Sequence, residues 1–322
     1  MSENDTPVIL PGALCMGLIF MPYFAMCGGA DALAGIFAGT VLAGLTALLS
    51  GYMRIWSKAL YLPLLAAVSA VGGLFLRLYS GLISRVLLPE YPVWPIGAAL
   101  LLTVLYGEAK GKNAVRRFAW LSGRVLIAAI PVCLIPAAKN ADIRGAAVLP
   151  QDAAAAADYA LLSCFLLALP LTVNYTQNGK TRPKAAALSV LLAGVLSAAA
   201  ALIWQARFGY ISQQPVLDLM YAGGTGSFIR RQEGLILAVI TLSAYSLLEG
   251  LLRCAAFCAG FGKAKKGGLI FCAALLLGTM FYPASVACLC RTVEISGAVF
   301  LLGLPLICAI CEKTGILKKE KK

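Results

Sequence analysis

The sequence VILPGALCMGLIFMPYFAMC fills Val8–Cys27 and is long and apolar enough to cross a bilayer as a helix. A comparable run, YALLSCFLLALPLTVNY, begins about half the chain later and fills Tyr159–Tyr175. Each run carries a proline in its later part, Pro22 in the first and Pro170 in the second. Because proline removes one backbone hydrogen bond and crowds the preceding turn, we expect each helix to break near its middle.

Paired interruptions at matching positions in two halves of a chain predict a midplane binding site in an inverted-repeat transporter. In lipid, a freed backbone group needs a partner, and a small polar ligand is one such partner. The alternative is that both prolines only kink helices within a bundle, which membrane proteins tolerate. The two runs alone leave both interpretations open.

The composition is that of a polytopic membrane protein. Of 322 residues, 61% are hydrophobic and 13% are charged, and the mean hydropathy is +0.86. One water-soluble core would not bury so much apolar surface. The opening MSENDT lacks the basic region and cleavage motif of a signal peptide, so we expect the first apolar run to be retained as a span.

The sequence contains no histidine, which excludes the Ser-His-Asp and Cys-His schemes and the common zinc sites. We therefore expect no enzymatic activity, no cofactor and no metal. The eleven cysteines lie within or at the ends of apolar runs, unlike a secreted disulfide framework. Cys308 and Cys311 form a C-x-x-C, which we interpret as helix packing rather than redox or metal chemistry.

Ten runs are long enough, or nearly so, to span a bilayer. They are Val8–Cys27, Ala32–Gly51, Ala59–Leu76, Val93–Tyr106, Trp120–Ala137, Tyr159–Tyr175, Ala185–Trp204, Gly234–Leu252, Gly268–Leu289 and Val293–Ile310. We predict an all-α membrane protein of ten transmembrane helices, arranged as two inverted five-helix repeats with helices 1 and 6 broken. The repeats occupy 1–138 and 157–311, joined by an outer loop at 139–156, and a basic cytoplasmic tail follows at 312–322.

The distribution of Lys and Arg predicts the orientation. The loops on the side of the N-terminus, with the C-terminal tail, hold 18 basic residues, against 7 on the other side. Basic loops stay in the cytoplasm, so we expect both termini there. The dispersal of these charges does not favour nucleic-acid binding. The tail KKEKK either contacts anionic membrane lipids or is simply solvated.

Four stretches resemble the spore germination permease family, the B-type integral-membrane subunits of nutrient germinant receptors. They are GLIFMP at Gly17–Pro22 followed by Asp31, LLPEYP at Leu87–Pro92, GKNAVRR at Gly111–Arg117 and FGYISQQPVLDLMYAGGTGSFIRRQE at Phe208–Glu233. The resemblance implies the fold of the amino acid–polyamine–organocation transporter superfamily. It also implies a bacterial cell membrane or inner spore membrane location, a small nutrient ligand such as an amino acid, and A-type and lipoprotein C-type receptor subunits as partners.

The chain departs from that family pattern at several positions. Cys15 replaces the first glycine of a usual Gly-x-Gly, and Leu33 replaces a usual tryptophan. Tyr91 and Asn113 replace a threonine and an acidic residue. The resemblance therefore does not transfer ligand specificity.

The candidate substrate site combines bare backbone at the two interruptions with nearby side chains. It consists of Cys15, Met16, Gly17, Leu18 and Pro22 in the first run, Ser163, Phe165 as a lid, Leu166 and Pro170 in the sixth, and Ser243 and Tyr245 in the eighth. Helix packing is the alternative for each of these side chains.

Few charged residues fall inside the apolar runs. Arg124, in the fifth, is a candidate coupling residue, because the resemblance implies a fixed cation there in place of a sodium ion; the alternative is a snorkelling interfacial arginine. Arg77 ends the third run and is interpreted as interfacial. Glu249 and Arg253 lie four residues apart and are expected to neutralise each other.

These observations predict a permease-like subunit of a spore germinant receptor that binds a small nutrient between the repeats and signals germination. The alternative is an amino acid permease of the same fold that carries out net transport. No carboxylate falls clearly at the bilayer centre, which favours a ligand sensor over a proton pump.

Overall fold

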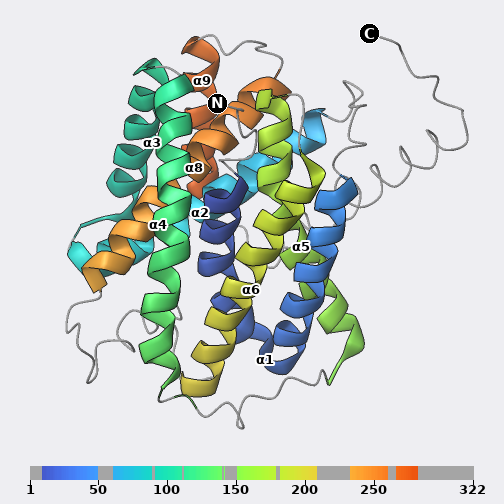
Figure 1. Ribbon diagram of the computed structural model, residues 1–322. Coiled ribbons are helices and arrows are strands. Elements are labelled where there is room, and N and C mark those ends of the chain that lie inside the picture. Colours follow the sequence, from blue (N-terminus) through green and yellow to red (C-terminus); the bar gives the residue numbers. More distant parts are fainter. Residues whose placement is uncertain are drawn as a thin grey trace, which may run out of the picture.

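The computed structural model describes residues 9–49, 61–88, 91–110, 112–139, 141, 151–178, 182–208, 233–259 and 266–281. All regular structure within these ranges is helical (Figure 1). The helices are α1 Ile9–Leu49, α2 Tyr61–Leu87, α3 Val93–Lys110, α4 Lys112–Ala138, α5 Ala153–Asn178, α6 Pro183–Phe208, α8 Glu233–Cys258 and α9 Lys266–Met280. The tenth predicted span, Cys308, Cys311 and the basic tail lie outside the described residues.

Five helical stretches in the described part are long and apolar enough to cross a membrane. They are Ile9–Leu49, Leu64–Leu87, Ala153–Leu171, Pro183–Phe208 and Ile240–Cys258. The predicted class, an all-helical membrane protein, is confirmed. The finer prediction of ten spans in two inverted repeats stays a prediction.

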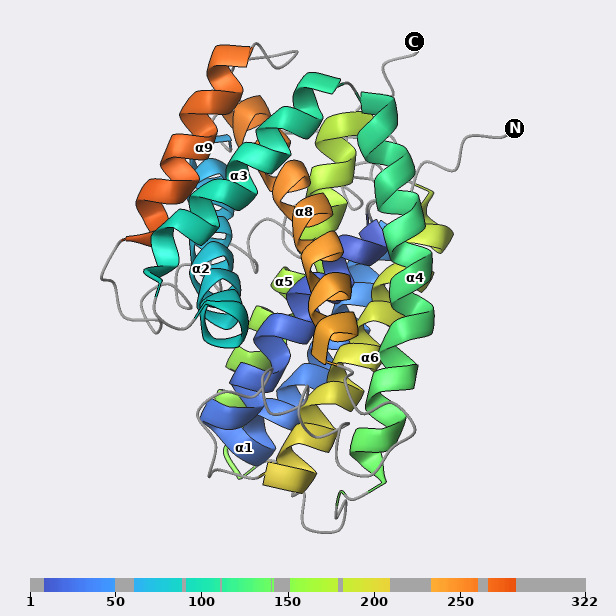
Figure 2. The same ribbon diagram turned by 90° about the vertical axis from the view of Figure 1, so that its left-hand side faces the viewer.

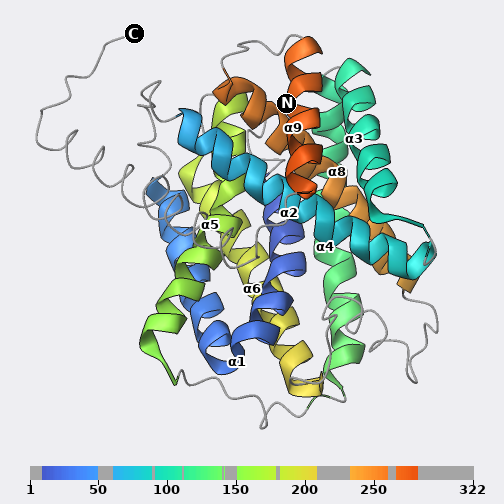
Figure 3. The same cartoon turned by 180° about the vertical axis from the view of Figure 1, so that it is seen from behind.

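The first two predicted spans form one element, α1, which bends sharply at Gly29. This residue has φ 55° and ψ −123°, a backbone conformation that glycine adopts because it has no Cβ. Figure 3 shows the two parts of α1 meeting in a V at this bend. We call residues 9–28 the first arm and residues 30–49 the second arm.

The predicted helix breaks at Pro22 and Pro170 are wrong. Helix α1 keeps helical backbone angles on both sides of Pro22, and α5 runs without interruption through Pro170. Membrane helices accommodate proline where neighbouring helices cover the freed backbone group. The ring of Pro170 packs against the first arm, since an added Cβ at Gly12 would lie only 3.1 Å from its Cγ.

Small residues let α5 and α6 approach the second arm closely. An added Cβ at Gly39 would lie 2.5 Å from the carbonyl oxygen of Ala160 and 2.7 Å from Cβ of Ser163, both on α5. An added Cβ at Gly194 of α6 would overlap the side chain of Thr40. Close backbone approach through small residues is how membrane helices associate. Helix α1 is consequently held between α5 and α6 (Figure 1).

Helices α2, α3 and α9 form a second group, seen together in Figure 2. Thr279 Oγ1 on α9 donates a hydrogen bond to the Ser69 carbonyl of α2 at 3.0 Å. Helix α8 connects this group to the rest, because Tyr79 of α2 donates to Thr241 Oγ1 of α8 at 2.8 Å. Helix α2 also corrects a prediction: it continues to Leu87, so the exposed Arg77 lies inside the helix rather than at its end.

Candidate functional site

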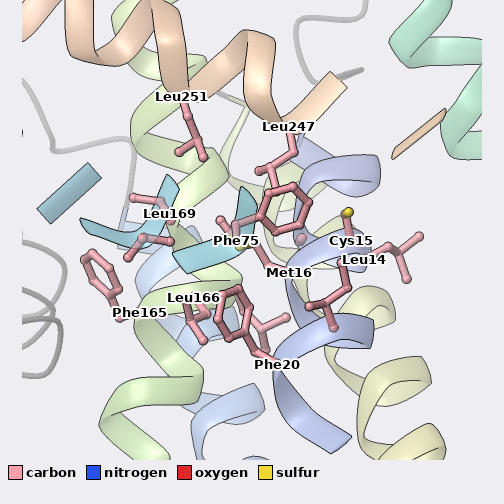
Figure 4. Packing of buried hydrophobic residues seen from close by; sticks show 14 of the residues in the cluster. Leu14, Cys15, Met16, Phe20, Phe75, Phe165, Leu166, Leu169, Leu247 and Leu251 are labelled. Atoms are coloured by element: carbon pink, nitrogen blue, oxygen red, sulfur yellow. The ribbon is translucent and has the colours of Figure 1, made fainter. Parts of the chain in front are cut away.

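The predicted substrate site lies inside the largest hydrophobic cluster. Cys15, Met16, Phe165 and Leu166 are each at most 2% exposed. Figure 4 shows side chains of four helices in this cluster: Leu14, Cys15, Met16 and Phe20 of α1, Phe75 of α2, Phe165, Leu166 and Leu169 of α5, and Leu247 and Leu251 of α8. The space between the first arm, α5, α2 and α8 is therefore filled by apolar side chains in this conformation.

The backbone expected to bind a ligand is covered by neighbouring helices. An added Cβ at Gly17 would lie 2.7 Å from Cβ of Ser197 on α6 and 3.5 Å from Cδ2 of Leu167 on α5. The turn at Cys15–Leu18 is helical and Leu18 is half-buried. The backbone of this turn is helical rather than unwound, although the Leu18 carbonyl lacks its usual N–H partner because the residue four positions on is Pro22. Unwound backbone is therefore not the feature that would bind a solute here.

The structure brings some predicted site residues together and separates others. Met16 of the first arm and Leu166 of α5 lie in this cluster, and Pro22 of the first arm is buried. Figure 4 shows Leu166 on the side of α5 toward Phe20, whereas Phe165 points the other way. A lid role for Phe165 over the first arm is not supported by this direction.

The polar candidates do not converge on the first arm. Ser163 of α5 lies against Gly39 of the second arm, and its buried Oγ has no hydrogen-bond partner within the part of the chain that the structure describes. On α8, Tyr245 reaches the backbone of Gly107 in α3, and Ser243 is 1% exposed. The hydroxyls of Ser163 and Tyr245 therefore belong to different helix interfaces.

Arg124, the candidate coupling residue, is exposed on α4. Its guanidinium lies over the ring of Trp120, with 3.7 Å from Cζ to the ring centroid. Stacking on an aromatic ring along the same helix is typical of an arginine at a membrane interface. Arg124 is thus exposed, whereas the predicted site residues on α1 and α5 are largely buried.

The predicted pair on α8 is confirmed, and it is buried. Arg253 Nε lies 2.7 Å from Glu249 Oε1, with the two side chains 12% and 1% exposed. One turn earlier, the hydroxyl oxygens of Ser246 and Ser122 of α4 are 3.4 Å apart. The ion pair thus lies on a helix that also contacts α4 through polar groups.

Sequence reasoning missed a cavity of about 580 Å³. It lies where α2 ends, α3 begins and α9 ends, beside Tyr23 of the first arm. Arg77, Gly81 and Arg85 of α2 line it together with Trp94 of α3. The available signal was the spacing of Arg77, Gly81 and Arg85, which recur every four residues and so share one helix face.

The fold is similar to that of Mhp1, a nucleobase-cation-symport-1 family transporter solved in a closed conformation with bromovinylhydantoin bound. The similarity has a TM-score of 0.63 at 14% sequence identity and covers 95% of this chain and 77% of that chain. The sequence matches no family model and no curated protein. The protein is a multi-pass membrane protein with a fold like that of Mhp1.

Proposed function

We propose that this protein transports a small polar nutrient, an amino acid or a similar solute, across the membrane. The observation that carries the proposal is the transporter fold, which extends over 95% of the chain. The proposed path lies between the first arm and α5 on one side and α2 and α8 on the other. The predicted site residues Met16 and Leu166 lie along it, together with Phe75 of α2 and Leu247 of α8.

The described conformation has this path closed by apolar side chains. Transport then requires that α1 and α5 move relative to α2 and α8, as one bundle moves against another in alternating access. Close contacts within each group, such as Gly39 against Ala160 in one and Thr279 against Ser69 in the other, support movement of each group as a unit. We include in the proposal two inverted five-helix repeats and cytoplasmic termini, which the distribution of Lys and Arg supports.

Solute counterflow into proteoliposomes tests the transport proposal. Vesicles preloaded with one unlabelled amino acid are diluted into the same labelled compound, and the standard amino acids and hydantoins are tested in turn. We expect protein-dependent accumulation of at least one of them. If folded, monodisperse protein produces no counterflow of any tested solute, transport of this class is overturned.

A permease-like germinant receptor subunit is the second candidate function, favoured by the four sequence stretches that resemble that family. Its partners would be the A-type and lipoprotein C-type subunits. Two results separate it from transport. Neighbouring reading frames for both subunits, together with their co-purification with this chain, favour the receptor, whereas turnover typical of a permease in the counterflow assay favours transport.

A further inference from the structure

The cavity beside α2 has the volume of a small-molecule site. Its volume of about 580 Å³ falls within the range of roughly 300–1,000 Å³ that is usual for ligand pockets. Its wall is held by a hydrogen bond from Ser84 Oγ to the Tyr91 carbonyl at 3.1 Å, which ties the end of α2 to the start of α3. This hydrogen bond therefore fixes two walls of the pocket relative to each other.

Its charge is positive. Arg77 and Arg85 both line it, and none of its described lining residues is Asp or Glu. In the described part of the chain, neither guanidinium forms an ion pair. The single helix face that holds both arginines also holds Gly81, where an added Cβ meets no described atom within 4 Å. The space at Gly81, between the two arginines on this face, is thus open.

Its remaining walls are aromatic and apolar. Trp94 is 51% exposed and Phe281 is 58% exposed, and both line the cavity with Tyr23. Guanidinium groups bind carboxylates through paired, charge-assisted hydrogen bonds, and aromatic rings bind planar apolar groups. The two kinds of surface together fit a ligand that has an anionic end and a planar apolar body.

We propose that this cavity binds a small organic anion, namely a carboxylate carried on a planar or aromatic body. Arg77 and Arg85 bind the carboxylate, and Trp94 contacts the planar part. The site is separate from the path proposed for transport, and its test measures binding alone. If the protein fails to transport any solute, this binding proposal still stands. If the cavity fails to bind an anion, the transport proposal still stands. Phosphate of an anionic lipid shares the charge of the ligand, so the test compares the two sources.

Tryptophan fluorescence gives a direct readout, because Trp94 lies in the cavity wall. The full-length protein is placed in nanodiscs of phosphatidylcholine and titrated with 4-nitrobenzoate, 4-nitrobenzamide and 4-nitrobenzylamine. These probes share one quenching ring and differ in charge. We expect saturable quenching by the anion alone, lost in Trp94→Phe. Equal quenching by all three probes, or quenching that Trp94→Phe leaves intact, overturns the proposal.

Variants with matched controls test the residues. Arg77→Gln combined with Arg85→Gln is expected to weaken 4-nitrobenzoate binding about tenfold or more, since each removes a charge-assisted contact. Arg182→Gln changes an exposed arginine that directly precedes α6; it is the control and is expected to leave binding unchanged. Gly81→Leu fills the open space and is expected to abolish binding, while Gly278→Leu, also facing open space, is not. Unchanged binding in both cavity variants overturns the proposal.

The lipid arm repeats the titration in nanodiscs that contain phosphatidylglycerol. If the cavity is an organic-anion site, we expect 4-nitrobenzoate to bind saturably in both lipids. Competition from phosphatidylglycerol should then weaken its binding at most modestly. If 4-nitrobenzoate does not bind in phosphatidylcholine, and phosphatidylglycerol alone raises the melting temperature in an arginine-dependent way, the cavity is a lipid site and the proposal is wrong.

Discussion

Asp31 and Asp152 join the bend of α1 to the start of α5. Asp31 Oδ1 accepts hydrogen bonds from the backbone N–H of Asp152 at 3.0 Å and of Gln151 at 2.5 Å. Asp152 in turn caps α5, because its Oδ1 accepts the N–H of Ala154 at 2.9 Å. The residues that follow Gly29 therefore hold the first turn of α5 in place.

Asp31→Ala removes both of these hydrogen bonds. We expect a loss of about 1 kcal/mol in the free energy of unfolding, modest because the site is solvent-exposed. Thermal melting in detergent measures the loss. Asp158→Ala, which removes one exposed carboxylate from α5, controls for the change in charge. Equal shifts in the two variants would show that the bonds to α5 contribute nothing.

Gly29→Ala tests the bend itself. Because a side chain at φ 55° is strained, we expect destabilisation by about 1–3 kcal/mol. Gly278→Ala is the opposite case, because Gly278 lies in helix α9 and faces open space. We expect this variant to be more stable than the parent protein by up to about 1 kcal/mol. Denaturation in mixed micelles gives both values. A Gly29→Ala variant as stable as the parent protein would contradict the backbone geometry.

Gly39→Leu should prevent the second arm from reaching α5. An added Cβ already lies 2.5 Å from the Ala160 carbonyl oxygen, and this backbone atom does not move easily. We expect the variant to yield little monodisperse protein in size-exclusion chromatography. Ala38→Leu, at the exposed neighbouring position, should behave like the parent. Equal yields would mean that this helix contact is not needed.

The Glu249 and Arg253 pair gives a test that depends on burial. Glu249→Leu or Arg253→Met alone removes one member of this buried ion pair and leaves the other charge in place, so we expect each to cost about 3–5 kcal/mol. The double variant Glu249→Leu with Arg253→Met should be far less destabilised than the sum of the single changes. Unfolding free energies of all four proteins complete the cycle. Additive losses would show that the two side chains are not energetically coupled.

The sequence predicts the positions of most helices but little of the arrangement of the candidate site. Nine of the ten predicted spans overlap the described helices, because long apolar runs have few structural options in a bilayer. The position of the interruption was wrong, since proline is a visible helix breaker whereas Gly29 acts only through its backbone angles. The site depends on which helix faces meet. Gly17, predicted to face a ligand, instead faces Ser197, which is 180 positions away.

Two native cysteines report whether the closed path opens. Cys15 is 1% exposed within the proposed path, whereas Cys27 near the bend is exposed. In variants that retain one of these two cysteines and have alanine at the other cysteine positions, we expect a methanethiosulfonate reagent to label Cys27 rapidly and Cys15 slowly. An apolar site this well covered reacts only when helices separate.

The labelling rate of Cys15 should then depend on transport. With a solute that undergoes counterflow, α1 and α5 must part from α2 and α8 in each cycle, so we expect the rate at Cys15 to change about tenfold or more, whereas Cys27 keeps its rate. The control is a solute that shows no counterflow. An unchanged Cys15 rate during active counterflow would mean that the solute crosses elsewhere, because a path lined by Met16 and Phe75 cannot conduct while its side chains stay in contact.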